Sequence, residues 1–135
     1  MLYNQKSRIL ILSSHTDDFE IAMGASAAKL VDEGHDIFLV TFCNAWESLP
    51  TGFDKDTLIN EQLMAAEAIG LKKQNIYFKD YPVRRFPEFR QEILDDLILL
   101  KKQIQPNIIF GPSKGDIHQD HATLAHEMIR AFKDK

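Results

Sequence analysis

The chain has 135 residues, of which 44% are hydrophobic, with a formal net charge of −4 and a pI near 5.7. This length and apolar share predict a single domain over residues 1–135, large enough to bury roughly two thirds of its unfolded surface. The acidic balance argues against nucleic acid and anionic membranes as partners, because both favour a basic face, and indicates a small-molecule partner.

Cys43 is the only cysteine, so no intramolecular disulfide is expected and a reducing compartment is the simpler assumption. A small buried hydrophobe is the favoured interpretation of Cys43, with a thiol lining a site as the alternative. The apolar runs are too short for a signal-peptide core or a membrane span. We therefore expect a cytoplasmic protein without membrane insertion.

Four apolar blocks predict strands at residues 9–12, 37–42, 75–78 and 107–110. The first two blocks are unbroken rather than alternating, which is typical of parallel strands covered on both faces. Helical periodicity predicts a helix after each strand, at residues 19–33, 56–69, 89–104 and 119–132. This alternation predicts the α/β class, as a doubly wound, Rossmann-like parallel sheet of strand order 3-2-1-4 with helices on both faces.

Two segments between these elements are irregular. Residues 44–56 contain Trp46, which either stacks on a substrate ring or pins its own loop. Residues 80–87 contain the pair Arg84 and Arg85, for which a solvated surface pair is the default interpretation and an anion site the alternative.

Chemistry-bearing side chains gather directly after the first and the fourth strand, as His15, Asp17, Asp18 and as His118, Asp120, His121. In the order 3-2-1-4 these strands are neighbours at the point where the winding reverses, so both clusters should meet in one crevice. Two histidines and a carboxylate with one open position are the usual catalytic zinc arrangement. Zinc of this kind activates water and polarises a carbonyl, which favours hydrolysis of an amide or ester.

Each cluster also has a purely structural interpretation. Asp17 and Glu20 match a capping box, and His121 could be a core histidine in the first turn of its helix. Asp116 and Asp120 suit a helix N-terminus. Capping leaves unexplained why both clusters follow buried strands that the topology makes neighbours.

Residues 15–21, His-Thr-Asp-Asp-Phe-Glu-Ile, resemble the His-Pro-Asp-Asp signature of the PIG-L/LmbE-like zinc N-deacetylases. Residues 118–121, His-Gln-Asp-His, resemble their His-x-Asp-His signature. The resemblance extends to residues 28–35 and 61–70, so it covers nearly the whole chain.

The resemblance implies that the zinc ligands are His15, Asp18 and His121. It also implies that Asp17 is the general base, that His118 stabilises the oxyanion or protonates the leaving amine, and that Asp120 orients a histidine. Iron would accept the same ligands. Family substrates are N-acetylated amino sugars, commonly N-acetylglucosamine linked to another group, and the products are acetate and a free amine.

The chain departs from the family pattern in three places. Thr16 replaces the usual proline, and Leu58 stands where the family often has an arginine. We expect Arg84 or Arg85 to replace that arginine in contacting a substrate phosphate. Relatives also continue further after the second motif, so C-terminal elements could be lacking here. An apolar edge at Ile108–Phe110 usually needs protection, and we expect a further strand there, from additional sequence or from another subunit of a homo-oligomer.

Three functions fit these patterns. The first is a zinc-dependent N-deacetylase acting on an N-acetyl amino sugar or its conjugate. The second keeps the metal but hydrolyses another amide or ester. The third is a truncated or non-catalytic α/β module that binds a sugar or a partner in the same crevice.

Overall fold

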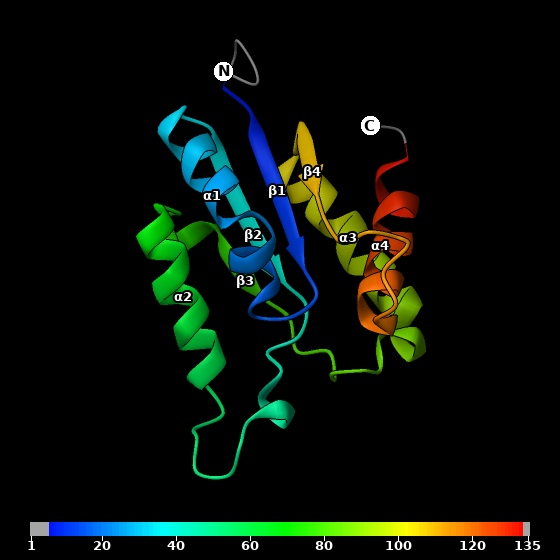
Figure 1. The fold of residues 1–135 in the computed structure, drawn as a ribbon. Coiled ribbons are helices and arrows are strands. Elements are labelled where there is room, and N and C mark those ends of the chain that lie inside the picture. The colour runs from blue at the N-terminus through cyan, green and yellow to red at the C-terminus, as the bar shows by residue number, and fades with distance from the viewer. Residues whose placement is uncertain (1–5, 134–135) are drawn as a thin grey trace.

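The computed structural model describes residues 6–133, in which strands and helices alternate as predicted (Figure 1). The elements are β1 (Arg8–Ser13), α1 (Asp18–Asp32), β2 (Asp36–Thr41), α2 (Thr57–Ile69), β3 (Ile76–Phe78), α3 (Arg90–Ile104), β4 (Ile108–Phe110) and α4 (Gln119–Phe132). The predicted domain also includes residues 1–5 and 134–135, which lie outside the described residues.

The four strands form one parallel sheet in the order β3-β2-β1-β4, which confirms the predicted topology. β1 lies at the centre, where Leu10 pairs with Phe38 of β2 on one side and with Ile109 of β4 on the other. This arrangement places the carboxyl ends of β1 and β4 side by side.

Helices cover both faces of the sheet, as predicted, and successive residues of β1 serve opposite faces (Figure 1). Ile9 and Ile11 pack with buried residues of α1 and α2, whereas Leu10 and Leu12 pack with those of α3 and α4. All four side chains are at most 3% exposed. Apolar side chains on both faces explain the unbroken apolar block in the sequence.

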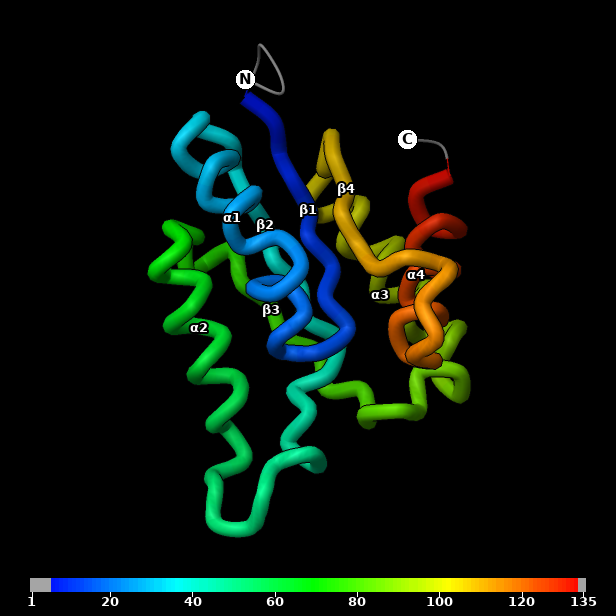
Figure 2. Tube along the Cα trace, in the orientation of Figure 1, coloured from blue at the N-terminus to red at the C-terminus, as the bar shows by residue number. Residues whose placement is uncertain are grey.

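Long connections cross the end of the sheet where the strands terminate (Figure 2). The β2–α2 loop contains a short 3-10 helix at Trp46–Ser48, and the β3–α3 segment contains another at Phe86–Phe89. The sequence analysis predicted neither of these turns. It also did not predict the break inside α1 at Met23, whose φ of −151° is not helical.

β4 lies at an edge of the sheet, as predicted, and its Phe110 is 38% exposed. The additional strand and the homo-oligomer at this edge remain predictions. Within residues 6–133, no helix combines the length and hydropathy needed to cross a bilayer.

Candidate metal centre

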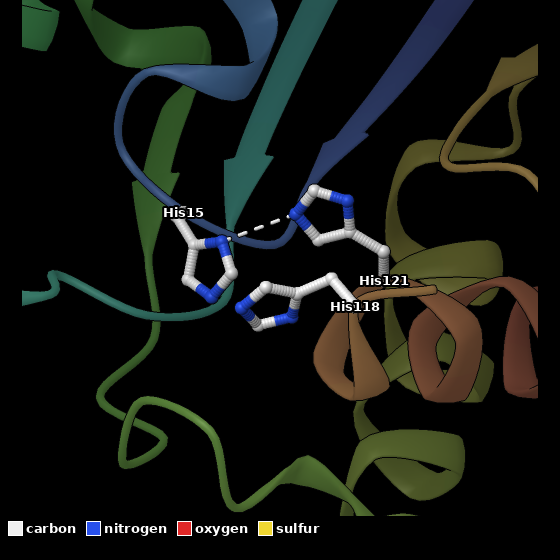
Figure 3. A group of neighbouring side chains, drawn as sticks. All are labelled: His15, His118 and His121. Carbon is white, nitrogen blue, oxygen red and sulfur yellow. Dashed lines mark hydrogen bonds between the residues drawn. The ribbon is translucent and has the colours of Figure 1, made fainter. Parts of the chain in front are cut away.

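The two predicted clusters converge. His15 follows β1 and His121 lies in the first turn of α4, yet His15 Nδ1 and His121 Nε2 are 3.2 Å apart (Figure 3). The ring of His118 stacks against that of His121, with centroids 4.8 Å apart. Pairing between β1 and β4 brings the two loops together, so the juxtaposition follows from the strand order.

His15 is held by a buried carboxylate. Its Nε2 lies 2.9 Å from Oδ2 of Asp120, a residue with no exposed surface. Asp120 also accepts the backbone N–H groups of Arg84 and Phe86, at 2.6 and 3.1 Å. Burial raises the pKa of Asp120, but the hydrogen bonds from His15, Phe86 and Arg84 outweigh this and leave the pKa below its usual value. An ionised Asp120 accepts a hydrogen bond from Nε2–H of His15, and in this tautomer Nδ1 of His15 carries a lone pair.

His121 is oriented in the same way by a second carboxylate. Its Nδ1 lies 2.8 Å from Oδ2 of Asp116. Hydrogen bonds from the backbone N–H of His118 and from the His121 ring hold the pKa of Asp116 below its usual value. The ionised carboxylate therefore accepts a hydrogen bond from Nδ1–H of His121, and in this tautomer the lone pair of Nε2 faces His15.

Asp18 completes a group of three acceptor atoms. Its Oδ2 lies 3.3 Å from His121 Nε2 and 3.7 Å from His15 Nδ1, and it accepts the backbone N–H of His15 at 2.8 Å. Ligands at about 2.0–2.1 Å from a tetrahedral zinc ion lie about 3.3–3.4 Å apart. The three atoms have nearly this spacing and no proton between them, so they fit a divalent cation.

A second combination of ligands is His15, His118 and His121, whose ring nitrogens all lie within 4.8 Å of one another. The hydrogen bonds favour the group with Asp18, because His118 Nδ1 accepts the backbone N–H of Asp120 at 3.1 Å. This bond places the ring proton on Nε2, which makes His118 a donor toward the site rather than a ligand. Burial, followed by the nearby His15, lowers the pKa of His118 and keeps its ring neutral.

Asp17 does not cap α1. It occupies the N-cap position, but its side chain makes no capping hydrogen bond, and the Glu20 carboxylate accepts none from the backbone of Asp17. The structure thus contradicts the capping-box interpretation of this pair. Asp17 is exposed and lines a cavity of about 480 Å³ together with His15 and His118.

A separate cavity of about 490 Å³ is lined by Asp18 and His121. The remaining lining comes mostly from apolar residues of β1 and α1 and from the segment that follows β4. The three proposed ligand residues therefore border two cavities, and Asp17 and His118 line only the first of them.

Asp116 was predicted only to suit a helix N-terminus, and its contact with His121 was not predicted. Its position five residues before His121, in a turn next to the ligand motif, was the available signal. Leu58 and Arg84 both line the cavity of about 480 Å³, although they are far apart in the sequence. Trp46 lies under the ammonium group of Lys55, 4.2 Å from the ring centroid, which favours the interpretation that it pins its own loop.

Comparisons with known proteins agree with the fold and with the family resemblance. The family model for GlcNAc-PI de-N-acetylase (PIG-L) matches residues 10–132. Diacetylchitobiose deacetylase from Thermococcus kodakarensis is 22% identical over 129 residues, which are 92% of this chain and 47% of that protein. The solved structure of N,N'-diacetylchitobiose deacetylase from Pyrococcus horikoshii superposes with a TM-score of 0.79 at 25% identity, over 93% of this chain and 49% of that one.

A third match shows that the fold alone does not define the reaction. The 4-carboxy-2-hydroxymuconate hydratase GalB from Pseudomonas putida superposes with a TM-score of 0.74 at 22% identity, over 93% of this chain and 55% of that one. The chain spans about half the length of these relatives.

Proposed function

The chain belongs to the GlcNAc-PI de-N-acetylase family, and on this premise we propose that it is a zinc-dependent hydrolase that removes the acetyl group from an N-acetyl amino sugar or its conjugate. The products are acetate and a free amine. The observation that carries the proposal is the set of three acceptor atoms, on His15, Asp18 and His121, spaced 3.2 to 3.7 Å apart.

The proposed metal ligands are His15, Asp18 and His121. When bound there, zinc would acidify a water molecule and polarise the amide carbonyl of the substrate. The carboxylates of Asp120 and Asp116 would hold the two ligand histidines in the required tautomer. Iron would be held by the same ligands, so the identity of the metal is part of the proposal.

Asp17 is the proposed general base. It is exposed in the cavity next to His15, and its side chain is not engaged in capping α1. A free carboxylate beside the cluster can take the proton of the attacking water.

His118 is proposed to act on the substrate oxygen or on the leaving amine. Its Nδ1 accepts a backbone N–H, so its Nε2 proton is available as a hydrogen-bond donor in the same cavity as Asp17. A neutral imidazole can donate this hydrogen bond to a developing oxyanion, as other fixed N–H groups do.

The test combines metal analysis with product analysis. Purified protein is expected to bind about one zinc ion and to release acetate from N-acetylglucosamine conjugates, and a chelator should abolish release. Asp17→Asn should keep the metal and lose acetate release, because a base and not a ligand has been removed.

The two other functions give different results in this experiment. A non-catalytic module would bind metal or sugar without any acetate release. A hydrolase of another class would release acid from simple amides or esters but not from N-acetyl sugars. Acetate release that persists in the chelator would contradict the metal-dependent mechanism.

A further inference from the structure

Arg84 and Arg85 are adjacent in the sequence but differ in their contacts. Arg85 forms a two-pronged ion pair with Glu88, with Nε–Oε1 and Nη2–Oε2 distances of 2.9 and 2.5 Å. Within residues 6–133, no carboxylate lies within 4.0 Å of the Arg84 guanidinium group. Both residues are exposed, as the default interpretation of a solvated surface pair predicts, but only the Arg85 guanidinium group is paired.

The available cation lies next to the proposed catalytic residues. Arg84 lines the cavity of about 480 Å³ that Asp17 and His118 also line. Glu61 contributes a carboxylate to the same cavity. A ligand bound here would therefore be within reach of the metal centre, a base and a guanidinium group.

The backbone of Arg84 is held in an unfavourable conformation. Its φ is +65°, in the left-handed region that residues other than glycine rarely adopt. Its N–H donates to Oδ2 of Asp120 at 2.6 Å, and its carbonyl accepts a hydrogen bond from Gln119 Nε2 at 3.3 Å. Strained backbone persists where surrounding contacts fix it, and such sites are frequently functional.

These contacts tie Arg84 to the metal centre. The Oδ2 atom of Asp120 that accepts the Arg84 N–H also accepts the proton of His15 Nε2. A single buried carboxylate therefore sets the position of a proposed metal ligand and of the arginine backbone. The guanidinium group is presented from a fixed backbone rather than from a loop without anchors.

We propose that Arg84 binds an anionic group, a phosphate or carboxylate, on the part of the substrate that remains with the amine. This assignment deepens the proposed function and rests on it. A guanidinium fork matches two oxygens of such a group, and in residues 6–133 no carboxylate lies within ion-pair distance of the one on Arg84. Asp17 and Glu61 can accept hydrogen bonds from sugar hydroxyl groups, but neither can bind an anion. Arg84 supplies the positive charge that an anionic group of the substrate needs.

The probes are two amine products, glucosamine 6-phosphate and glucosamine, which cannot be deacetylated. Their binding to the full zinc-loaded chain is measured by titration calorimetry. The phosphorylated sugar is expected to bind about tenfold to a hundredfold more tightly, as a charge-assisted hydrogen-bonded pair provides. Inorganic phosphate serves as a third probe and distinguishes a site for free phosphate from one for a phosphorylated sugar.

Arg84→Gln and Arg85→Gln form a matched pair, because both remove one positive charge from adjacent positions. Arg84→Gln should abolish the preference for the phosphorylated sugar, whereas Arg85→Gln should leave it within about twofold. Arg84→Gly keeps the left-handed backbone without strain and should also abolish the preference. This variant separates loss of the guanidinium group from misfolding of the segment.

The proposal is wrong if the two sugars bind equally to the unmodified chain, or if both glutamine variants lose the preference to the same extent. Because binding is measured without turnover, this result does not depend on deacetylation. A preserved Arg84-dependent preference without acetate release from any N-acetyl sugar would instead contradict the proposed function and leave the anion site in place.

Discussion

His15 Nδ1 and His121 Nε2 face each other at 3.2 Å, across 106 positions of sequence. The other nitrogen of each ring is hydrogen-bonded to a carboxylate, that of Asp120 for His15 and that of Asp116 for His121. In the tautomers that these carboxylates favour, both facing nitrogens carry lone pairs. The arrangement is therefore suited to a cation between them.

The first prediction distinguishes Asp18 from His118 as the third metal ligand. Asp18→Asn removes the anionic oxygen of the group and should weaken zinc binding by more than about a hundredfold. Loss of a residue that only orients a metal ligand already weakens binding about tenfold to a hundredfold, and loss of the ligand itself should cost at least as much. His118→Asn should change zinc affinity by no more than about threefold. Competition with a chromophoric chelator measures both constants.

Asparagine is the matched replacement for His118 because this residue is the N-cap of α4 and accepts the backbone N–H of Asp120. Asparagine is among the best N-cap residues, so the helix should retain its start. Zinc affinity that falls as strongly in His118→Asn as in Asp18→Asn would instead favour the combination of three histidines.

The second prediction concerns the buried carboxylate. Asp120→Asn replaces an oxygen that accepts hydrogen bonds with an amide donor, so one of its three N–H partners is left unpaired. The expected loss in the free energy of unfolding is about 1.5–3 kcal/mol. Zinc affinity should fall about tenfold to a hundredfold because His15 loses its orienting partner. Urea denaturation and zinc titration provide the two measurements.

Asp116→Asn is the control, since it removes the matching partner of His121 from a partly exposed position. We expect a comparable loss in zinc affinity with a change in unfolding free energy of no more than about 0.5 kcal/mol. Equal destabilisation by both substitutions would contradict the distinct structural role of Asp120.

The sequence was sufficient to predict the sheet order and the meeting of the two clusters. Strands buried on both faces appear as unbroken apolar blocks, and Leu10 illustrates why, since it has no exposed surface. Once the strands were assigned, the order 3-2-1-4 placed the ends of β1 and β4 together without any information on side chains.

The contacts of Arg84 and Asp116 could not be predicted in the same way. The segment around Arg84 has no hydrophobic period, and its path is fixed by N–H groups that bind a carboxylate 36 residues further along the chain. Asp116 was consistent with helix capping, and only the turn after β4 directs it to His121. Irregular segments depend on such long-range contacts, which local sequence patterns do not encode.

The third prediction tests the strain at Arg84. The left-handed conformation costs a residue with a Cβ atom roughly 1–2 kcal/mol, and glycine loses roughly 0.5–1 kcal/mol more conformational entropy on folding. Arg84→Gly should therefore raise the free energy of unfolding by about 0.5–1 kcal/mol. Arg85 has an ordinary φ of −121°, so Arg85→Gly should lower it by about 0.5–1 kcal/mol. Urea denaturation should show changes of opposite sign in the free energy of unfolding of the two variants. A lower free energy of unfolding in both would indicate that the Arg84 backbone is not strained.

The fourth prediction concerns the pH dependence of Cys43, which has no exposed surface. Burial raises the pKa of its thiol to about 11, although the backbone N–H of Ala45 partly offsets this by donating to Sγ at 3.2 Å. The unfolded thiol has a pKa of about 8.5, so the folded state binds its proton more tightly. The resulting stabilisation is complete below about pH 8.5 and is lost as the pH rises toward 11.

Alkylation by iodoacetamide measures this directly, because the thiolate is the reactive form. At pH 8 the folded protein should react at least about a hundredfold more slowly than the urea-unfolded chain, in which Cys43 is exposed and partly ionised. Cys43→Ser supplies the blank for labelling, and its unfolding free energy relative to the unmodified chain should improve between pH 8.5 and 10. Equal labelling rates in the folded and unfolded protein at pH 8 would place Cys43 at an accessible position and revive its role as a thiol that lines the site.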